Sequence, residues 1–517
     1  MKLGKKKKTL AQSTQPIPPS DHSGIKGAVA LLLVGGFLLG GCAVGPNYRR
    51  PSTDAPAEFK SANAIGAWKE AVPLDYLAKG TWWEVFGDSR LNELELQAAA
   101  ANRELRAAIA RVEQSRSTAR LAGNELIPSL DFNPSARRER YSPNQLPSFG
   151  SITINTFRVP LDFSYEVDLW GRIRRGFEAA RADAQGSFAA FHGVLLGLHA
   201  DVARNYFTIR ALDAEIATVN ATLGLRGEQL KLTRGRFDGG IGTELDVVRA
   251  ETELATAEAE NAVLSRHRAE IENALAILVG ENPSSFQLSP LSDHPAWALD
   301  PPVIPVGLPA HLLERRPDVA ESERQLAAAN ARIGVAKAAF FPVVRLTGSG
   351  GYVSGDLENL LSWDSRVWSI GPGVSLPIFA QARNRSNYQR SKASYEEAVA
   401  RYRQQVLVAF GDVENSLSGL RFLSEQAAAQ NRAVESAQRA AALALQRYEA
   451  GLVGYLDVVD ANRAALVTQR SRAQLAGERL IASVQLIKAL GGGWSEAELL
   501  IPAHEKRTAR SDRGAKF

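Results

Sequence analysis

Two aspartates near the end of the sequence are the side chains best placed to form a charged site. They lie in the stretch RYEAGLVGYLDVVDA, where Asp457 and Asp460 are three residues apart and therefore share one face of a helix. Such carboxylates attract cations and resist anions, and they also suit the first turn of a helix, where the dipole favours negative charge. Asp246 holds the position of Asp457 in a second, similar stretch, RFDGGIGTELDVVRA, where Arg249 replaces Asp460.

The only cysteine, Cys42, follows a sequence typical of a bacterial secretion signal. Residues 1–26 hold six lysines and one acid, and residues 27–41 are an uncharged apolar run, shorter than the roughly 20 residues of a membrane helix. The letters LLGGC resemble a lipobox, whose cysteine receives lipid and becomes the first mature residue. We expect residues 1–41 to be removed and Cys42 to carry a covalent lipid. The alternative is a buried cysteine at the end of an anchor helix.

Little in the sequence indicates catalysis or nucleic-acid binding. The net charge of +5 equals that of the removed part, six lysines less Asp21, so the mature chain is near neutral. The sequence contains neither a phosphate-binding loop nor a His-Glu-x-x-His metal motif. His192 and His199, seven residues apart, are expected to be a plain surface pair, and residues 348–351 (GSGG) a bend in a strand. We expect no enzyme activity, no metal site and no cofactor besides the lipid.

The elements that position these residues occur twice. The two quoted stretches are offset by 211 residues (Arg236 to Arg447), and each half reads helix, extended segment, loop, extended segment, long helix, turn, shorter helix. This is a single duplicated unit, with a period far above that of solenoid repeats. The expected divisions are a signal at 1–41, a lipidated extended segment at 42–90, repeats at 91–300 and 301–493, and a polar tail at 494–517.

The extended segments predict strands of a membrane barrel. From Phe157 to Leu169 apolar and polar residues alternate without exception, and residues 368–378 alternate less cleanly. Segments 128–140 and 341–353 are the expected partner strands. Strands of this length with one polar face fit a barrel better than a soluble sandwich. Four strands cannot close a barrel and lipid does not tolerate open edges, so several chains must share one.

Two long helices are predicted from proline-free segments at 171–235 and 383–450, each about 100 Å long. Such helices must pack against neighbours and would extend the barrel as a helical tube. Gly240 and Gly451 lie in the turns at their far ends, where glycine permits a left-handed backbone.

With these features in place, the chain resembles the outer-membrane efflux proteins of the TolC and OprM class, on their lipoprotein branch. The stretches that carry the resemblance are CAVGPNYRRP, WWEVFGDSRLNELELQAAAANRELRAA, DLWGRIRR, RRPDVAESERQLAAANARIGVAKAAFFPVVRLTG and ALGGGW. The resemblance implies an α+β membrane protein: a homotrimer with a twelve-stranded barrel, four strands per protomer, continued by a periplasmic helical tube. It also implies a periplasmic adaptor and an inner-membrane resistance-nodulation-division transporter as partners.

The resemblance assigns roles at the helix tips. Asp457 and Asp460 would form the narrowest ring of the tube, and Gly240 and Gly451 would mark tips that dock the adaptor. An aromatic residue at the place of Tyr448 bonds in the family to an acid at the place of Asp246, which holds the tip closed.

The implied function is the outer-membrane exit duct of a tripartite efflux system for drugs or other small molecules. The alternative within the family is the duct of a type I protein secretion system. A periplasmic adaptor is less consistent with the duplicated strand pairs, and no motif supports an envelope-bound hydrolase. The expected location is the outer membrane, with a lipid anchor and a large periplasmic part.

Overall fold

The computed structural model describes residues 43–52, 56, 59–60, 81–144, 151–290, 301–302, 304 and 316–492. The expected signal, Cys42 and the tail at 494–517 lie outside the described residues. The helices are η2 (Trp82–Phe86), α2 (Ser89–Ala101), α3 (Arg103–Asn124), α4 (Arg172–Asp238), α5 (Glu244–Val279), α7 (Pro317–Ala338), η3 (Trp363–Ser365), α8 (Gln381–Glu449) and α9 (Tyr455–Ala489). The strands are β1 (Ser129–Phe132), β2 (Ser135–Tyr141), β3 (Ile152–Val167), β4 (Val343–Ser354) and β5 (Arg366–Ser375).

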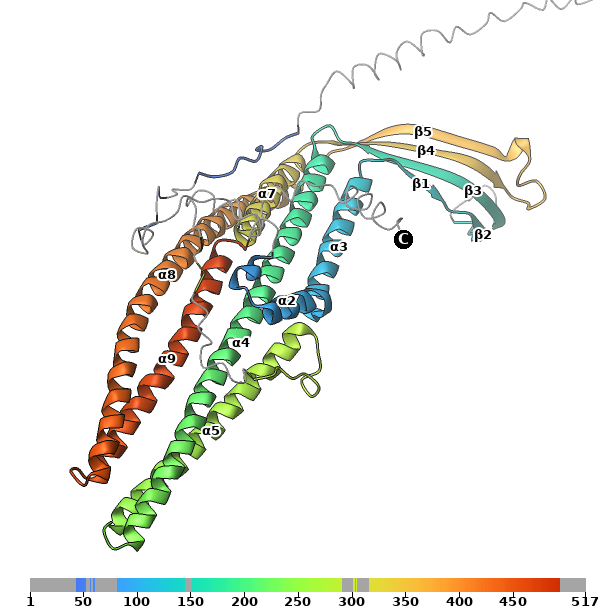
Figure 1. Ribbon diagram of the computed structural model, residues 1–517. Coiled ribbons are helices and arrows are strands. Elements are labelled where there is room, and N and C mark those ends of the chain that lie inside the picture. Colours follow the sequence, from blue (N-terminus) through green and yellow to red (C-terminus); the bar gives the residue numbers. More distant parts are fainter. Residues whose placement is uncertain are drawn as a thin grey trace, which may run out of the picture.

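The molecule is elongated, with the strands projecting from one end of the long helices and the helix turns at the other end (Figure 1). The element order after α2 repeats: α3, strand pair, α4, α5 and then α7, strand pair, α8, α9. Helices α4 and α8 contain 67 and 69 residues, which confirms the two long helices predicted from the proline-free segments. No helix in the described ranges is both long and apolar enough to span a membrane.

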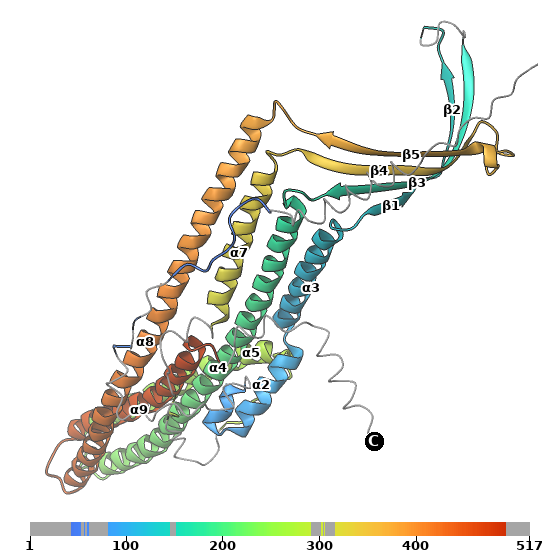
Figure 2. The same cartoon turned by 90° about the horizontal axis from the view of Figure 1, so that it is seen from above.

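All strands belong to one antiparallel sheet in the order β1-β3-β4-β5, with β2 also paired to β3 (Figure 2). The first predicted strand is divided in two at residues 133–134, because Pro134 has no N–H to donate to a ladder. Strands β1 and β2 lie end to end along β3, so the described sheet is four strand positions wide. The hairpins of the two repeats are joined directly through β3 and β4.

The glycine run at 348–351 lies inside β4, the strand in which the sequence placed it. These glycines allow β3 to approach β4 closely. A Cβ on Gly351 would lie 2.1 Å from the Val159 carbonyl oxygen and 2.9 Å from the Pro160 Cα, so only glycine fits opposite this proline.

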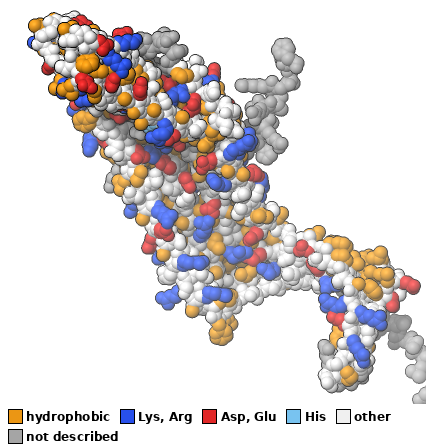
Figure 3. All heavy atoms as spheres, turned by 90° about the horizontal axis from the view of Figure 1, so that it is seen from below, with side chains coloured by type: hydrophobic (Ala, Val, Ile, Leu, Met, Phe, Trp, Pro, Cys, Tyr) orange, Lys and Arg blue, Asp and Glu red, His pale blue; other side chains and the backbone are white. Residues whose placement is uncertain are grey.

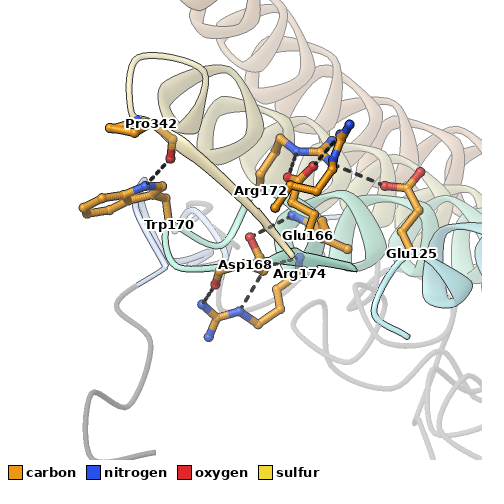
Figure 4. Close-up of polar contacts among 9 residues, drawn as sticks. Glu125, Glu166, Asp168, Trp170, Arg172, Arg174 and Pro342 are labelled. Atoms are coloured by element: carbon orange, nitrogen blue, oxygen red, sulfur yellow. Dashed lines mark hydrogen bonds and ion pairs between the residues drawn. The ribbon is translucent and has the colours of Figure 1, made fainter. Parts of the chain in front are cut away.

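The sequence DLWGRIRR forms the junction between β3 and α4 (Figure 4). Asp168 accepts hydrogen bonds from the backbone of Ile173 and Arg174, which caps the first turn of α4. Trp170 donates its indole N–H to the Pro342 carbonyl at 2.8 Å, and Arg172 binds Glu166 at 2.7 Å. The strands and the helices are therefore fixed to one another by side chains of both repeats.

The residues directly after Cys42 pack on this junction. The Val44 N–H donates to the Trp170 carbonyl, and Ala43 occupies the space where a side chain on Gly171 would lie, 2.7 Å from its Cβ. Further along, the amide of Asn330 in α7 donates to the Pro46 carbonyl. The start of the described chain is thus anchored at the level where the strands begin.

The main core lies around α2 and the middle of α4, and it contains a buried pair of ionisable side chains. The His199 Nδ1 is 2.7 Å from Glu95 Oε2, and the Trp83 ring lies 4.2 Å from the imidazole. The expectation that His199 belongs to a surface pair is therefore wrong: the α2 segment, which sequence periodicity did not reveal, covers it.

Burial raises the pKa of Glu95 well above 4.5 and lowers the pKa of His199 from 6.5 to about 4, because both charged forms lose hydration. The raised pKa of Glu95 adds stability that is present below pH 4.5 and is lost as pH rises through the folded pKa of this carboxyl. The lowered pKa of His199 adds stability that is present above pH 6.5 and is lost as pH falls towards 4.

Candidate functional site at the helix tips

The two turns at the helix tips have the same backbone structure. In the first, Gly240 and Ile241 donate to the carbonyls of Phe237 and Arg236; in the second, Gly451 and Leu452 donate to those of Tyr448 and Arg447. Gly240 and Gly451 have φ values of 73° and 74°. This pair of bonds around a left-handed glycine is the Schellman arrangement, which satisfies the last carbonyls of a helix. The predicted turn glycines are confirmed as such.

Each tip presents aliphatic side chains to solvent. Ile241 and Leu452, which follow the two glycines, are 73% and 69% exposed. Leu245 and Leu456, at the next equivalent positions, are also exposed. The tips are therefore small apolar surfaces related by the internal repeat, and a large exposed aliphatic side chain at both is typical of a contact surface.

The two tips are packed against each other through Tyr448. The Arg236 guanidinium lies 4.7 Å from the Tyr448 ring, and its Nη1 donates to the Tyr448 carbonyl at 3.3 Å. The Tyr455 ring lies 5.4 Å away on the other side. Burial raises the pKa of Tyr448, and a further contribution comes from the charge of Asp246, against the opposing effect of Arg236.

The expected hydrogen bond between Tyr448 and Asp246 is not formed in this protomer. Asp246 is the third residue after Thr243, the N-cap of α5, and its carboxylate accepts a hydrogen bond from the Thr243 hydroxyl at 2.8 Å. The Tyr448 side chain instead packs under Arg236. Capping competes for the carboxylate, and the Thr-x-x-Asp spacing of residues 243–246 was the available sequence signal.

Asp457 and Asp460 are both exposed on the same side of the first turns of α9. Their neighbours Val458 and Val459 are buried against α4 and α5 in the cluster around Tyr448. The helix therefore turns its apolar face to the first hairpin and its carboxylates outward. The predicted common face is confirmed; its place on an aperture depends on other copies of the chain.

Glu253, which sequence reasoning missed, joins three helices just behind the tips. It is buried on α5, its Oε2 is 3.0 Å from Arg226 Nη2 of α4, and its Oε1 accepts from Arg463 of α9. Arg226 also donates to the Glu253 carbonyl at 2.6 Å. Burial, followed by the charge of Glu253, raises the pKa of Tyr455 to about 12.

A second set of ion pairs lies one heptad further along the same helices. Arg470 of α9 binds Glu260 of α5 and Glu215 of α4. Glu253 and Glu260 are seven residues apart, as are Arg463 and Arg470, and this spacing was the available sequence signal. These pairs hold α9 to the first hairpin, so they link the two repeats near the tips.

No group of His, Cys, Asp and Glu in the described part of the chain could hold a metal ion. The fold and the tips have close counterparts among known proteins. The family model "Outer membrane efflux protein" matches residues 96–281 and 308–492. The chain belongs to this family.

The solvent efflux pump outer membrane protein SrpC of Pseudomonas putida is 35% identical over 465 residues, covering 89% of this chain and 97% of that protein. The pyoverdine export outer membrane protein OpmQ of Pseudomonas aeruginosa is 34% identical over 472 residues, covering 89% and 95%.

Solved structures are similar as well. The outer-membrane channel OprN superimposes with a TM-score of 0.80 at 31% identity, over 88% of this chain and all of that one. The open state of the Neisseria gonorrhoeae MtrE channel gives 0.75 at 30% identity, over 88% and 99%. This family member is accordingly an outer-membrane efflux protein with a large periplasmic portion.

Proposed function

We propose that this protein is the exit duct of a tripartite efflux pump for small apolar molecules such as solvents and drugs. The observation that carries the proposal is one chain with a membrane-type sheet at one end and two matched, apolar helix tips about 100 Å away. Relatives at 32–35% identity are named for toluene, solvent and antibiotic efflux, which favours efflux over protein secretion.

The edges of the sheet support the proposal of a homotrimer. The sheet is four strand positions wide and ends at β1/β2 on one side and β5 on the other. In lipid, unpaired backbone groups at an edge cost several kcal/mol each, by order of magnitude, so the edges must be paired with other copies. Three protomers would supply twelve strand positions and close a barrel.

Lipidation of Cys42 is supported by the position of its neighbours. Ala43 and Val44 pack on the junction between strands and helices, through Gly171 and the Trp170 carbonyl. A lipid on the preceding residue would enter the membrane where the strands do, so anchor and barrel would be used together.

The tips would dock the periplasmic adaptor through Ile241 and Leu452 beside the two glycines, and three protomers would present six such tips. The adaptor would connect the duct to an inner-membrane transporter of the resistance-nodulation-division class. Asp457 and Asp460, exposed near the second tip, would form a negative ring around the axis of a trimer. Such a ring attracts cations and is compatible with apolar solutes, which carry no charge.

A substitution at the tips tests this proposal. Ile241→Asp and Leu452→Asp place charges on the apolar tips and should reduce export of an apolar dye in cells that contain the cognate pump and adaptor. Leu452→Met is the matched control and should retain export. Native mass measurement must show the same trimer for all variants; a monomer, or unchanged export with charged tips, would contradict the proposal.

A further inference from the structure

The face of the sheet that is apolar along most of its length ends in arginines. Phe157 and every second residue from there to Val167 lie on this apolar face. Directly paired residues share a face, so Ala136, opposite Phe157, belongs to it. Two residues further out on β2 come Arg138 and then Arg140, paired with Asn155 and Thr153 of β3.

Strand β5 shows the same change. Ile370 and Trp368 lie on the apolar face opposite Gly348 and Gly350, and they are 82% and 81% exposed. The next residue outward on this face is Arg366, paired with Tyr352. Arginines therefore begin one step beyond the last apolar residue on both outer strand positions of the sheet. Figure 3 shows basic side chains beyond a hydrophobic area towards the free end of the strands.

The position along the strands at which the apolar face ends, and at which the arginines begin, changes from one side of the sheet to the other. Through the register, Arg366 is level with Val159 of β3, whereas Arg138 is level with Asn155. Four residues correspond to about 13 Å along β3, and three strand spacings to about 14 Å across it. On a flat sheet this displacement corresponds to a row that slopes by about 43°, and Figure 2 shows that β2 and the end of β3 turn away from β4 and β5.

The arginines of the apolar face differ from those of the opposite, polar face in their ion pairing. On the polar face Arg137 is paired with Glu139, Arg158 with Asp162, and Arg345 with Glu166. In the described ranges, no carboxylate pairs with the three arginines of the apolar face.

Within the described ranges, the partners of the apolar-face arginines are neutral groups, and Arg138 has none. Arg140 donates to the Ser151 hydroxyl at 3.1 Å, and Arg366 donates to the Trp363 carbonyl at 2.9 Å. Asp364, two residues from Arg366, forms no ion pair with it within the described chain. Arg138, Arg140 and Arg366 are exposed residues, and the Arg366 guanidinium also lies over the Trp363 ring.

We infer that Arg138, Arg140 and Arg366 form a binding surface for the phosphate groups of the glycolipid in the outer leaflet of the outer membrane. The helices lie in the periplasm, so the free ends of the strands point outward. The apolar face contacts lipid chains, and the next groups that lipid presents along it are head groups. Arginine binds phosphate through two parallel N–H groups, which gives it more than the attraction of a point charge.

The charge pattern favours a lipid over a protein partner. The arginines follow the slope of the apolar edge across the sheet and lie on its lipid-facing side, where a soluble protein has no access to the adjoining apolar residues. Each basic residue next to an apolar membrane surface increases the affinity for anionic head groups by about fivefold. The inference uses the outer-membrane location of the family and does not depend on which solute the duct exports.

The test uses the full-length protein in detergent and two purified lipids: bisphosphorylated lipid A and the same lipid A after phosphatase treatment. Binding is measured by titration with native mass detection. The wild type should bind the phosphorylated form at least tenfold more tightly than the dephosphorylated form. Arg138→Gln with Arg140→Gln and Arg366→Gln should lose this preference. Arg137→Gln with Arg158→Gln, on the polar face, is the matched control and should keep it.

Several results would overturn the inference. A wild type with no preference for phosphorylated lipid A would do so without any variant, as would equal losses in the apolar-face and polar-face variants. Phosphatidylglycerol binding as tightly as lipid A would exclude the glycolipid as the specific ligand. If the triple variant does not form the oligomer of the wild type, the single substitution Arg366→Gln is tested instead. It should lower the affinity for phosphorylated lipid A by about fivefold.

Discussion

Loss of the Glu253 carboxylate should loosen the two hairpins at the tips. Glu253→Gln keeps the shape of the side chain but leaves Arg226 buried without a counter-charge, while Arg463 loses its partner at the surface. Removing one partner of a buried ion pair costs about 3–5 kcal/mol, because the remaining charge is neither paired nor hydrated. Arg226 keeps its bond to the carbonyl of residue 253, so we expect the lower end, about 3 kcal/mol.

Hydrogen exchange measures this loss locally. Exchange of protected amides reports the free energy of local opening, so about 3 kcal/mol corresponds to an increase on the order of 100-fold in exchange rate. The increase should appear in peptides from residues 244–258 and 455–465. Peptides from residues 198–212, in the main core, should exchange as in the wild type.

Arg463→Gln is the matched control for this substitution. The Arg463 side chain is 56% exposed, so its pair with Glu253 is worth about 0–1 kcal/mol and exchange should rise by no more than about fivefold. If Glu253→Gln exchanged like the wild type, or if the two variants exchanged alike, the buried pair with Arg226 would not be what joins the hairpins. The same variant should raise the open population in single-channel recordings if separation of the hairpins accompanies opening.

Three other outcomes follow from the structure. Asp457→Asn with Asp460→Asn should lower cation selectivity and block by multivalent cations in planar bilayers, and unchanged selectivity would place the charged constriction elsewhere. Cys42→Ser should abolish lipid in the mass of the mature N-terminus while the trimer persists, and an unmodified residue ahead of Cys42 in the wild type would refute lipidation. Glu95→Gln should remove the loss of stability that ionisation of Glu95 causes as pH rises, which is at most about 1.4 kcal/mol per pH unit per protomer; identical pH profiles in thermal unfolding would show that the raised pKa of Glu95 does not contribute to stability.

The long elements could be predicted because their signals are local. Strand β3 alternates apolar and polar residues over many positions, and α4 and α8 are long proline-free segments rich in alanine. The turn glycines were visible because the repeat aligned them. By contrast, the break between β1 and β2 depends on one proline, Pro134. The alternation of apolar and polar residues does not reveal that its backbone lacks an N–H.

The contacts that define the site are non-local, which is why the sequence did not reveal them. Glu253 meets Arg463 across 210 residues, and Arg236 meets Tyr448 across 212. Asp246 was predicted to bind Tyr448, but a hydroxyl three residues away on its own helix competes successfully for it. The faces of the arginines on β2 and β5 became clear only from the register of the sheet, since a shift of one residue would exchange them.

The central claim is that the chain conducts small apolar solutes out of the cell as part of a tripartite pump. Its most direct test is the rate of dye efflux from cells that carry the cognate pump and adaptor but lack their own outer-membrane efflux proteins. The wild-type chain should restore energy-dependent efflux of an apolar fluorescent dye, and cells without it should retain the dye. Retention of the dye despite normal amounts of the trimer in the outer membrane would contradict the assignment as an exit duct for such molecules.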